Sequence, residues 1–136
     1  MKKRILGGLL ILCLMFAAGC GQGEKEARIA DLDYTVLDEG NVPQELKEVI
    51  EGKKTTAFKL TYSDSQYLYL AVGYGEQASG GYSIQVNDLY LTENHIYLDA
   101  DLLGPKRGEE VAQAVTYPWI VIKLEYRTES VVFDVG

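Results

Sequence analysis

The sequence is short of the side chains that most catalytic and metal-binding sites need. Its 136 residues include one histidine, two cysteines and one tryptophan. His95 is therefore the only candidate for a histidine-dependent site, and no serine stands in the Gly-x-Ser-x-Gly pattern of a nucleophile turn. Basic residues number 13 against 20 acidic ones, which argues against a nucleic-acid binder. These absences favour a partner-binding protein with no catalytic residues and no cofactor.

What the sequence does contain argues against disorder. Hydrophobic residues make up 47% and aromatic residues 10% of the chain, against only three prolines. A chain this apolar can bury enough surface to offset its conformational entropy, and its length suits one domain. We therefore expect a single folded domain with its own core.

The first twenty residues have the organisation of a secretion signal. Three basic residues at positions 2–4 precede the uncharged apolar run from Ile5 to Ala18, and Ala17-Ala18-Gly19 stands directly before Cys20. The run is shorter than the roughly 20 residues that a permanent membrane-spanning helix needs. The segment resembles a bacterial lipoprotein signal peptide, which implies cleavage before Cys20 and lipidation of that cysteine. A retained N-terminal anchor is the alternative.

This resemblance implies a place in the cell and a domain division. Residues 1–19 would be the signal peptide, and the lipid would hold the mature chain on the extracytoplasmic face of the cell membrane, or in the outer membrane where the envelope has one. Removing three of the 13 basic residues leaves ten against 20 acidic ones, and leaves no cysteine for a disulfide. Residues 20–32 are expected to be a lipid-anchored polar linker before a β domain over residues 33–136.

One helix is expected near the start of this domain. Apolar residues recur there at helical spacing, namely Val42, Leu46, Val49 and Ile50. Pro43 suits a first helical position, and Gly52 supplies a stop. We expect this helix to pack on the sheet that follows, where it would cover an edge or an open end.

After residue 52 the pattern changes to the alternation typical of β-strands. Strands are expected over residues 34–37 before the helix, and over 56–62, 68–72, 82–91, 95–102, 115–126 and 131–133 after it. Short connections would pair chain neighbours as antiparallel hairpins, including the last two strands through residues 127–130. The fold class is therefore mainly β: an antiparallel β-sandwich or half-open barrel of about six to seven strands with one short helix.

His95 begins a strand whose same face carries Tyr97, Asp99 and Asp101. This set could be a hydrogen-bonded or metal-binding cluster, or an ordinary exposed sheet face. Calcium would need further oxygen ligands, and the calcium-loop pattern is absent. We expect no metal site.

Two short motifs stand at the ends of long connections. The glycine-rich connection 73–81 leads into Tyr82, and the connection 103–114 leads toward Tyr117-Pro118-Trp119. Long loops on a small rigid scaffold are frequent binding sites. The candidate partner-binding residues are Ser79, Gly80, Gly81, Tyr82, Tyr117, Pro118 and Trp119. The alternative for Trp119 is a structural corner that packs the indole into the core.

With strands over residues 68–73 and 95–102 on either side of the first motif, the chain resembles the C-terminal domain of the PrcB family of protease-complex lipoprotein subunits. The resemblance covers residues 58–124. It implies a PrcB-like domain in a non-catalytic accessory subunit that associates with a surface protease and stabilises it. The expected partners are therefore an extracytoplasmic protein, which the family resemblance suggests is a protease, and the membrane that holds the lipid anchor.

The same motifs are similar in order to those of chagasin-like cysteine-protease inhibitors, which are immunoglobulin-like domains with adjacent binding loops. This likeness implies that the motifs are neighbours at one end of a sandwich, where Tyr82 and Trp119 would form a wedge for a protease. Trp119→Ala would then abolish partner capture without unfolding the domain. A further alternative is a structural or small-ligand-binding envelope lipoprotein that uses a tyrosine-rich face of Tyr67, Tyr69 and Tyr97.

Overall fold

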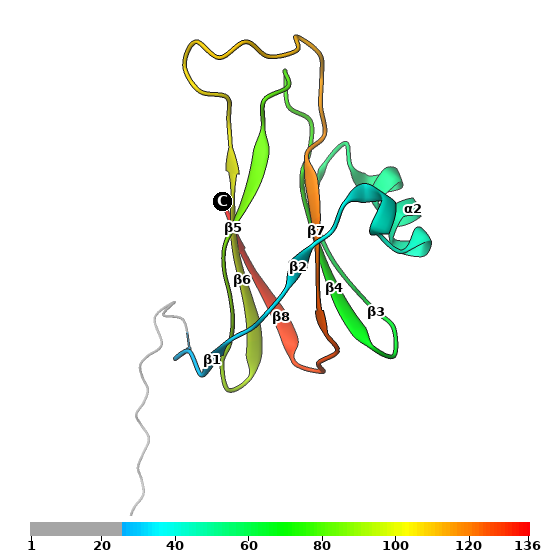
Figure 1. The fold of residues 1–136 in the computed structure, drawn as a ribbon, viewed down its shortest axis with the longest axis vertical. Helices are drawn as coiled ribbons and strands as arrows, with labels where there is room; N and C mark the ends of the chain where they lie inside the picture. Colours follow the sequence, from blue (N-terminus) through cyan, green and yellow to red (C-terminus); the bar gives the residue numbers. More distant parts are fainter. Residues whose placement is uncertain (1–25) are drawn as a thin grey trace, which may run out of the picture.

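The computed structural model describes residues 26–136, which form two four-stranded β-sheets with one α-helix beside them (Figure 1). The expected signal peptide, Cys20 and the linker residues up to 25 lie outside the described residues. The elements are β1 (Ala30–Asp31), β2 (Thr35–Val36), the 3₁₀ turn η3 (Glu39–Asn41), α2 (Gln44–Lys53), β3 (Ala57–Ser63), β4 (Tyr67–Tyr74), β5 (Ser83–Leu91), β6 (His95–Leu103), β7 (Trp119–Glu125) and β8 (Ser130–Val135). The mainly β fold class is confirmed. No helix of this described part is long and apolar enough to span a membrane.

The first sheet has the strand order β1-β5-β6-β8 and the second has the order β2-β7-β4-β3. The predicted hairpins β3–β4 and β5–β6 are confirmed. The predicted hairpin of the last two strands is wrong, because β7 pairs with β4 while β8 runs parallel to β6 in the other sheet. Because the chain crosses from the second sheet to the first between β7 and β8, Val131 and Phe133 pack across the core against Ile122 and Leu124. In a hairpin, β7 and β8 would instead be neighbours in one sheet.

The core between the sheets is aliphatic and draws on both sheets. Alternation along each strand sends every second side chain inward. The buried members are Leu68, Leu70, Val72, Leu89, Ile96, Leu98, Ile122 and Leu124. These rows fix the relative position of the two sheets, and with it the position of the loops at their ends.

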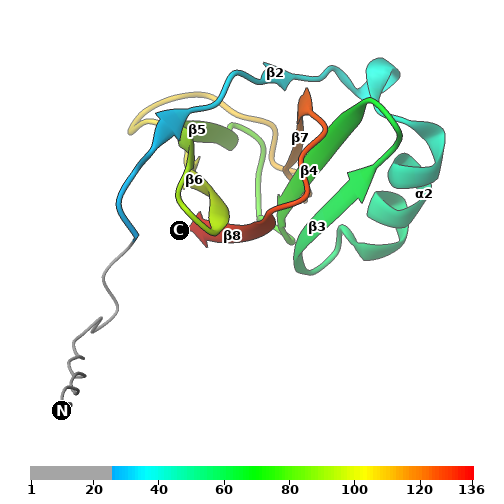
Figure 2. The ribbon, with the colours of Figure 1, turned by 90° about the horizontal axis from the view of Figure 1, so that it is seen from below.

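A second core lies between α2 and the outer face of the second sheet, so the molecule has three layers (Figure 2). Leu46 and Ile50 on the helix pack with Phe58, Ala71 and other sheet residues. The helix therefore covers a sheet face, and not the edge or open end that its position in the sequence suggested. The expected place of Val49 on the buried side is also wrong.

Val49 is 44% exposed, although its spacing matches the apolar stripe. The buried helix residues Leu46 and Ile50 are four apart, and Val42, which precedes the helix, continues the same row. A helix that lies flat on one sheet buries only such a narrow stripe, and position 49 falls at its margin.

The segment that was expected to be a linker is in part docked on the first sheet. We call residues 26–31 the N-terminal arm. Within it, β1 pairs with β5, and the backbone N–H of Ile29 donates to the carbonyl of Leu91 at 2.7 Å. The Arg28 guanidinium lies 4.0 Å from the ring centre of Tyr90 and donates to the Asp88 carboxylate. These contacts are made with residues 59 or more positions away, so local polarity alone did not predict them.

Candidate partner-binding site

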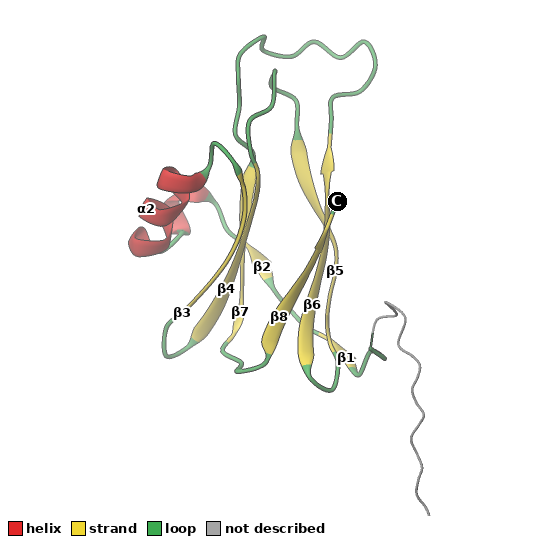
Figure 3. Cartoon of the chain, turned by 180° about the vertical axis from the view of Figure 1, so that it is seen from behind, coloured by secondary structure: helices red, strands yellow, loops and turns green. Residues whose placement is uncertain are grey.

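The two long connections leave the strands at the same end of the sandwich. We call residues 75–82 and 104–118 together the loop pole, and Figure 1 shows both segments rising beyond the strand ends. Figure 3 shows the N-terminal arm at the other end, beside the turn between β5 and β6. The arm and the loop pole therefore lie at opposite ends of the long axis.

Backbone hydrogen bonds join the two predicted motifs. Gln77 and Thr116 form an antiparallel bridge, with N–H to O=C distances of 2.8 and 3.0 Å. The Thr116 hydroxyl donates to the carbonyl of Ser79 at 2.7 Å, and the Gly80 N–H donates to the carbonyl of Ala112 at 2.8 Å. The structure thus brings the two motifs together, as their order implied. The loops hold each other in place although they are far apart in the sequence.

Gly81 lies where the two loops touch most closely. Its φ of +89° is in the left-handed region, which residues with a Cβ rarely adopt. A Cβ there would also lie 2.4 Å from the Val111 side chain and 3.0 Å from that of Pro105. Next to it, the half-buried Tyr82 ring packs beside Gly104, where a Cβ would lie 3.3 Å from a ring carbon. Gly81 is therefore required for the close packing of the loops.

The aromatic side chains of the two motifs serve different contacts. Trp119 is half-buried and packs on the cluster beneath α2, so the structural-corner interpretation of this residue is confirmed. Tyr117 lies near the end of α2, where the Lys54 ammonium is 5.7 Å from its ring centre. The expected wedge of Tyr82 and Trp119 stays a prediction; the Tyr82 ring packs beside Gly104, at the end of the first sheet.

Sequence reasoning missed two exposed apolar residues at the loop pole. Val115 is 48% exposed within the loops, and Leu103 at their border is 43% exposed. The sequence analysis placed Val115 at the start of an expected strand and Leu103 at the start of a connection, so neither was a candidate binding residue. An exposed aliphatic side chain on a loop held by other loops is a candidate contact for a protein partner.

The face of His95, Tyr97, Asp99 and Asp101 divides into two unrelated groups. The His95 Nδ1 lies 2.9 Å from a carboxylate oxygen of Glu26, on the N-terminal arm. Asp99 and Asp101 instead accept hydrogen bonds from the Asn87 amide at 3.2 and 2.9 Å, where β5 has a bulge. Across residues 26–136 there is no group of three or more histidine, cysteine, aspartate or glutamate side chains placed to hold a metal ion.

Glu26 is the centre of the arm's docking. Besides the His95 contact, its carboxylate accepts hydrogen bonds from the Thr92 hydroxyl and from the Asn94 amide. The hydrogen bonds from His95, Thr92 and Asn94, in that order of weight, lower the pKa of Glu26 to about 2. The charged form of Glu26 is therefore the form that holds the arm.

The expected tyrosine-rich face does not exist as one surface. Tyr69 packs in the cluster beneath α2, and Tyr67 borders the same cluster. Tyr97 lies on the first sheet and stacks on Tyr90, with 5.2 Å between ring centres and 4° between ring planes. Because these tyrosines belong to two different sheets, no single ligand could use all three.

The fold defines a small β-sandwich domain with an outer helix layer and with interlocked loops at one pole. Residues 68–125 match the family model described as PrcB C-terminal, which supports the expected resemblance to the PrcB family over this part of the chain. The family is one of accessory subunits of protease complexes. The match spans β4 to β7 and both loops of the loop pole, and begins ten residues later than the expected resemblance. No curated protein and no solved structure matches the chain.

Proposed function

We propose that the protein is a non-catalytic, lipid-anchored accessory subunit whose loop pole binds an extracytoplasmic protein, a surface protease. The observation that carries the proposal is the interlocked pair of loops inside the family-matched segment. Loops that are already held together lose little conformational entropy when they bind, which favours recognition of a folded partner. Exposed Val115 and Leu103 supply apolar contact area at this pole.

The arrangement of the two poles suits a tethered subunit. The chain that follows a lipid on Cys20 would join the domain at the N-terminal arm. This arm lies at the end opposite the loop pole (Figure 3). The loops would then face away from the membrane. After cleavage ten basic residues would remain against 20 acidic ones, and this acidic excess would also repel the anionic lipid surface.

The test is capture of the partner by the tagged full-length chain in its own cells. Val115→Lys places a charge among the loop contacts, and Val49→Lys is a matched control because Val49 is similarly exposed but lies on α2, outside both loops. We expect wild type and Val49→Lys to capture a secreted protease, and Val115→Lys to capture about tenfold less. Equal capture by all three chains would show that the loop pole does not bind the partner.

The effect on the captured protease separates an accessory subunit from a chagasin-like inhibitor. An accessory subunit should lengthen the lifetime of the protease or raise its activity. An inhibitor should lower the activity in proportion to the amount bound. The protease is therefore assayed with and without the purified full-length chain.

A further inference from the structure

The sandwich is closed at one side and open at the other. β1 and β2 follow each other in the chain, so the backbone itself bridges the two sheets on that side (Figure 2). On the other side β8 ends the first sheet and β3 ends the second, and no further strand of residues 26–136 pairs with either. Between them lies a groove of about 430 Å³. We call it the seam groove; it is lined by Ala57, Phe58, Lys59, Gly73, Tyr74, Val135 and Gly136.

The backbone of β3 has unpaired hydrogen-bonding groups along this open side. Asp64 N–H donates to the Tyr67 carbonyl across the β3–β4 turn, and Tyr74 N–H donates to Pro118 and not to β3. In an antiparallel ladder every second residue pairs with the neighbouring strand, and the residues between point their backbone groups the other way. The outward-pointing residues of β3 include Ala57, Lys59 and Thr61, whose backbone groups are free to pair with another strand.

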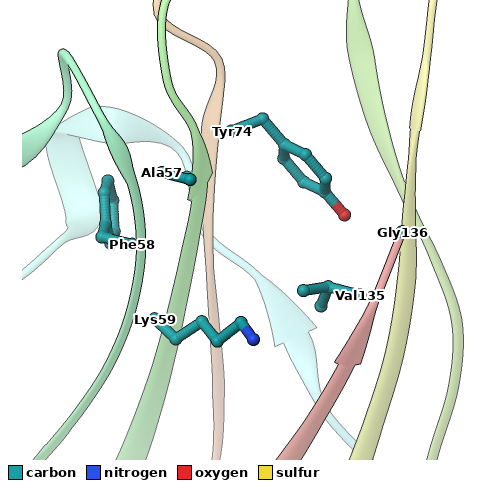
Figure 4. Close-up of a pocket in the computed structure, with 7 residues that line it drawn as sticks. Ala57, Phe58, Lys59, Tyr74, Val135 and Gly136 are labelled. Carbon is teal, nitrogen blue, oxygen red and sulfur yellow. The ribbon is translucent and has the colours of Figure 1, made fainter.

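The side chains of these same residues are exposed, and Lys59 brings a positive charge to a groove with otherwise uncharged lining side chains. Ala57, Lys59 and Thr61 lie on the face of β3 that looks toward the first sheet, yet all three are exposed. The first sheet does not reach across to cover them. Lys59 has no ion pair with any residue of the described chain, and Figure 4 shows its side chain extending into the groove. An acidic side chain would complement this charge.

Tyr74 adds a hydrogen-bond donor without a partner. Its ring lies between the sheets and its hydroxyl points toward the end of β8 (Figure 4). The hydroxyl oxygen is buried and has no hydrogen-bond partner among the described residues. Burial first, and then the charges of Asp101 and Asp99, raise the pKa of Tyr74, so the hydroxyl stays protonated near neutral pH. A strand that enters the groove and displaces the side chains over this hydroxyl would supply its missing acceptor, for example a carbonyl.

We infer that the seam groove binds an extended segment of a partner protein, which adds to the free edge of β3 as a further strand of the second sheet. Such a strand would pair with the backbone of β3, place an acidic side chain at Lys59 and bring an acceptor to the Tyr74 hydroxyl. A lipid chain would leave the β3 backbone unpaired. A second copy of this chain, pairing β3 with β3, would bring the two Lys59 charges close together. This inference does not use the loop pole, and it can hold if that proposal fails.

The test measures amide hydrogen exchange in the full-length chain with a defined peptide. The probe is a capped eight-residue peptide in which valine alternates with threonine and one central threonine is replaced by aspartate. We expect it to slow exchange at the amides of Ala57, Lys59 and Thr61 by about tenfold or more, because a paired strand shields them. The same peptide with lysine at the centre should bind about threefold more weakly, as expected for an exposed ion pair.

Three variants make the result specific. Lys59→Glu should reverse the preference, so that the lysine peptide binds better than the aspartate peptide. Tyr74→Phe should bind the aspartate peptide about fivefold more weakly, because it removes the donor that the peptide would use. Its folding stability should not fall, because the hydroxyl has no partner in the free chain. Thr61→Pro removes an outward N–H but keeps the ladder to β4, and should abolish binding.

Three other outcomes would each overturn the inference. Absence of protection with any of these peptides would show that the edge is not a binding site. Protection of the same amides without peptide, rising with protein concentration, would assign the edge to a second copy. Binding of laurate in the groove with no protection of the β3 amides would assign the groove to a lipid.

Discussion

Gly81 should be the most sensitive glycine of the loop pole, because replacing it with alanine introduces two separate costs. Its φ of +89° disfavours any side chain, and this conformational cost is about 1 kcal/mol. The new Cβ would also lie 2.4 Å from the Val111 side chain, and overpacking of that kind typically costs about 1–3 kcal/mol. Gly81→Ala should therefore lower the free energy of unfolding by about 3 kcal/mol.

Two comparisons separate these costs. Gly108 also has a positive φ, +81°, but a Cβ there meets nothing within 4 Å, so Gly108→Ala should cost only about 1 kcal/mol. In a Val111→Ala background the cost of Gly81→Ala should fall toward the same value, because the steric part is relieved. Urea unfolding of the full-length chain measures all four variants. Equal costs at Gly81 and Gly108 would contradict the packing of the two loops.

Two further predictions concern the rest of the molecule. Trp119→Ala should lower the free energy of unfolding by about 2 kcal/mol in urea, because the half-buried indole packs on the cluster beneath α2; an unchanged midpoint would refute that packing. The N-terminal arm should undock in acid: Glu26 has a pKa of about 2 in the folded chain against an ordinary 4.5, so its stabilising contribution is complete above pH 4.5 and is lost as the pH falls toward 2. The Ile29 amide resonance should follow this change, and Glu26→Gln should remove the pH dependence; the same acid response in the variant would assign it to another group.

The Trp119 result bears on how binding residues are tested. A variant that both loses a core contact and loses partner capture cannot assign the residue to an interface. Val115 is better suited because it is exposed and has no part in either core. The loop pole should therefore be probed through its aliphatic residues and not through its tryptophan.

The fold was predictable where local pattern and burial agree. Alternation located β3 to β6, and the three-residue connection before His95 correctly indicated a hairpin. The pairing of β8 was not predictable, because a short polar connection fits a hairpin and a crossing between sheets equally well. Long-range burial of Val131 and Phe133 decides between them, and single-sequence patterns do not contain that information.

The candidate site was predictable in position but not in detail. The motif order placed the two loops together, and the Gln77–Thr116 bridge realises that placement. Which side chains remain exposed depends on packing across the loops, so the sequence favoured Trp119 over Val115. The docking of Glu26 on His95 was missed for a similar reason, because a charged segment near the N-terminus looks like a tether.

The measurement that tests the central claim most directly is site-specific photocrosslinking in the protein's own cells. A photoreactive amino acid replaces Val115 at the loop pole in one chain and Tyr126 near the opposite end in another, since both positions are 48% exposed. The account predicts a crosslink to a secreted protease from position 115 and none from position 126. A protease crosslinked from position 126 alone, or no protein crosslinked from position 115, would contradict it.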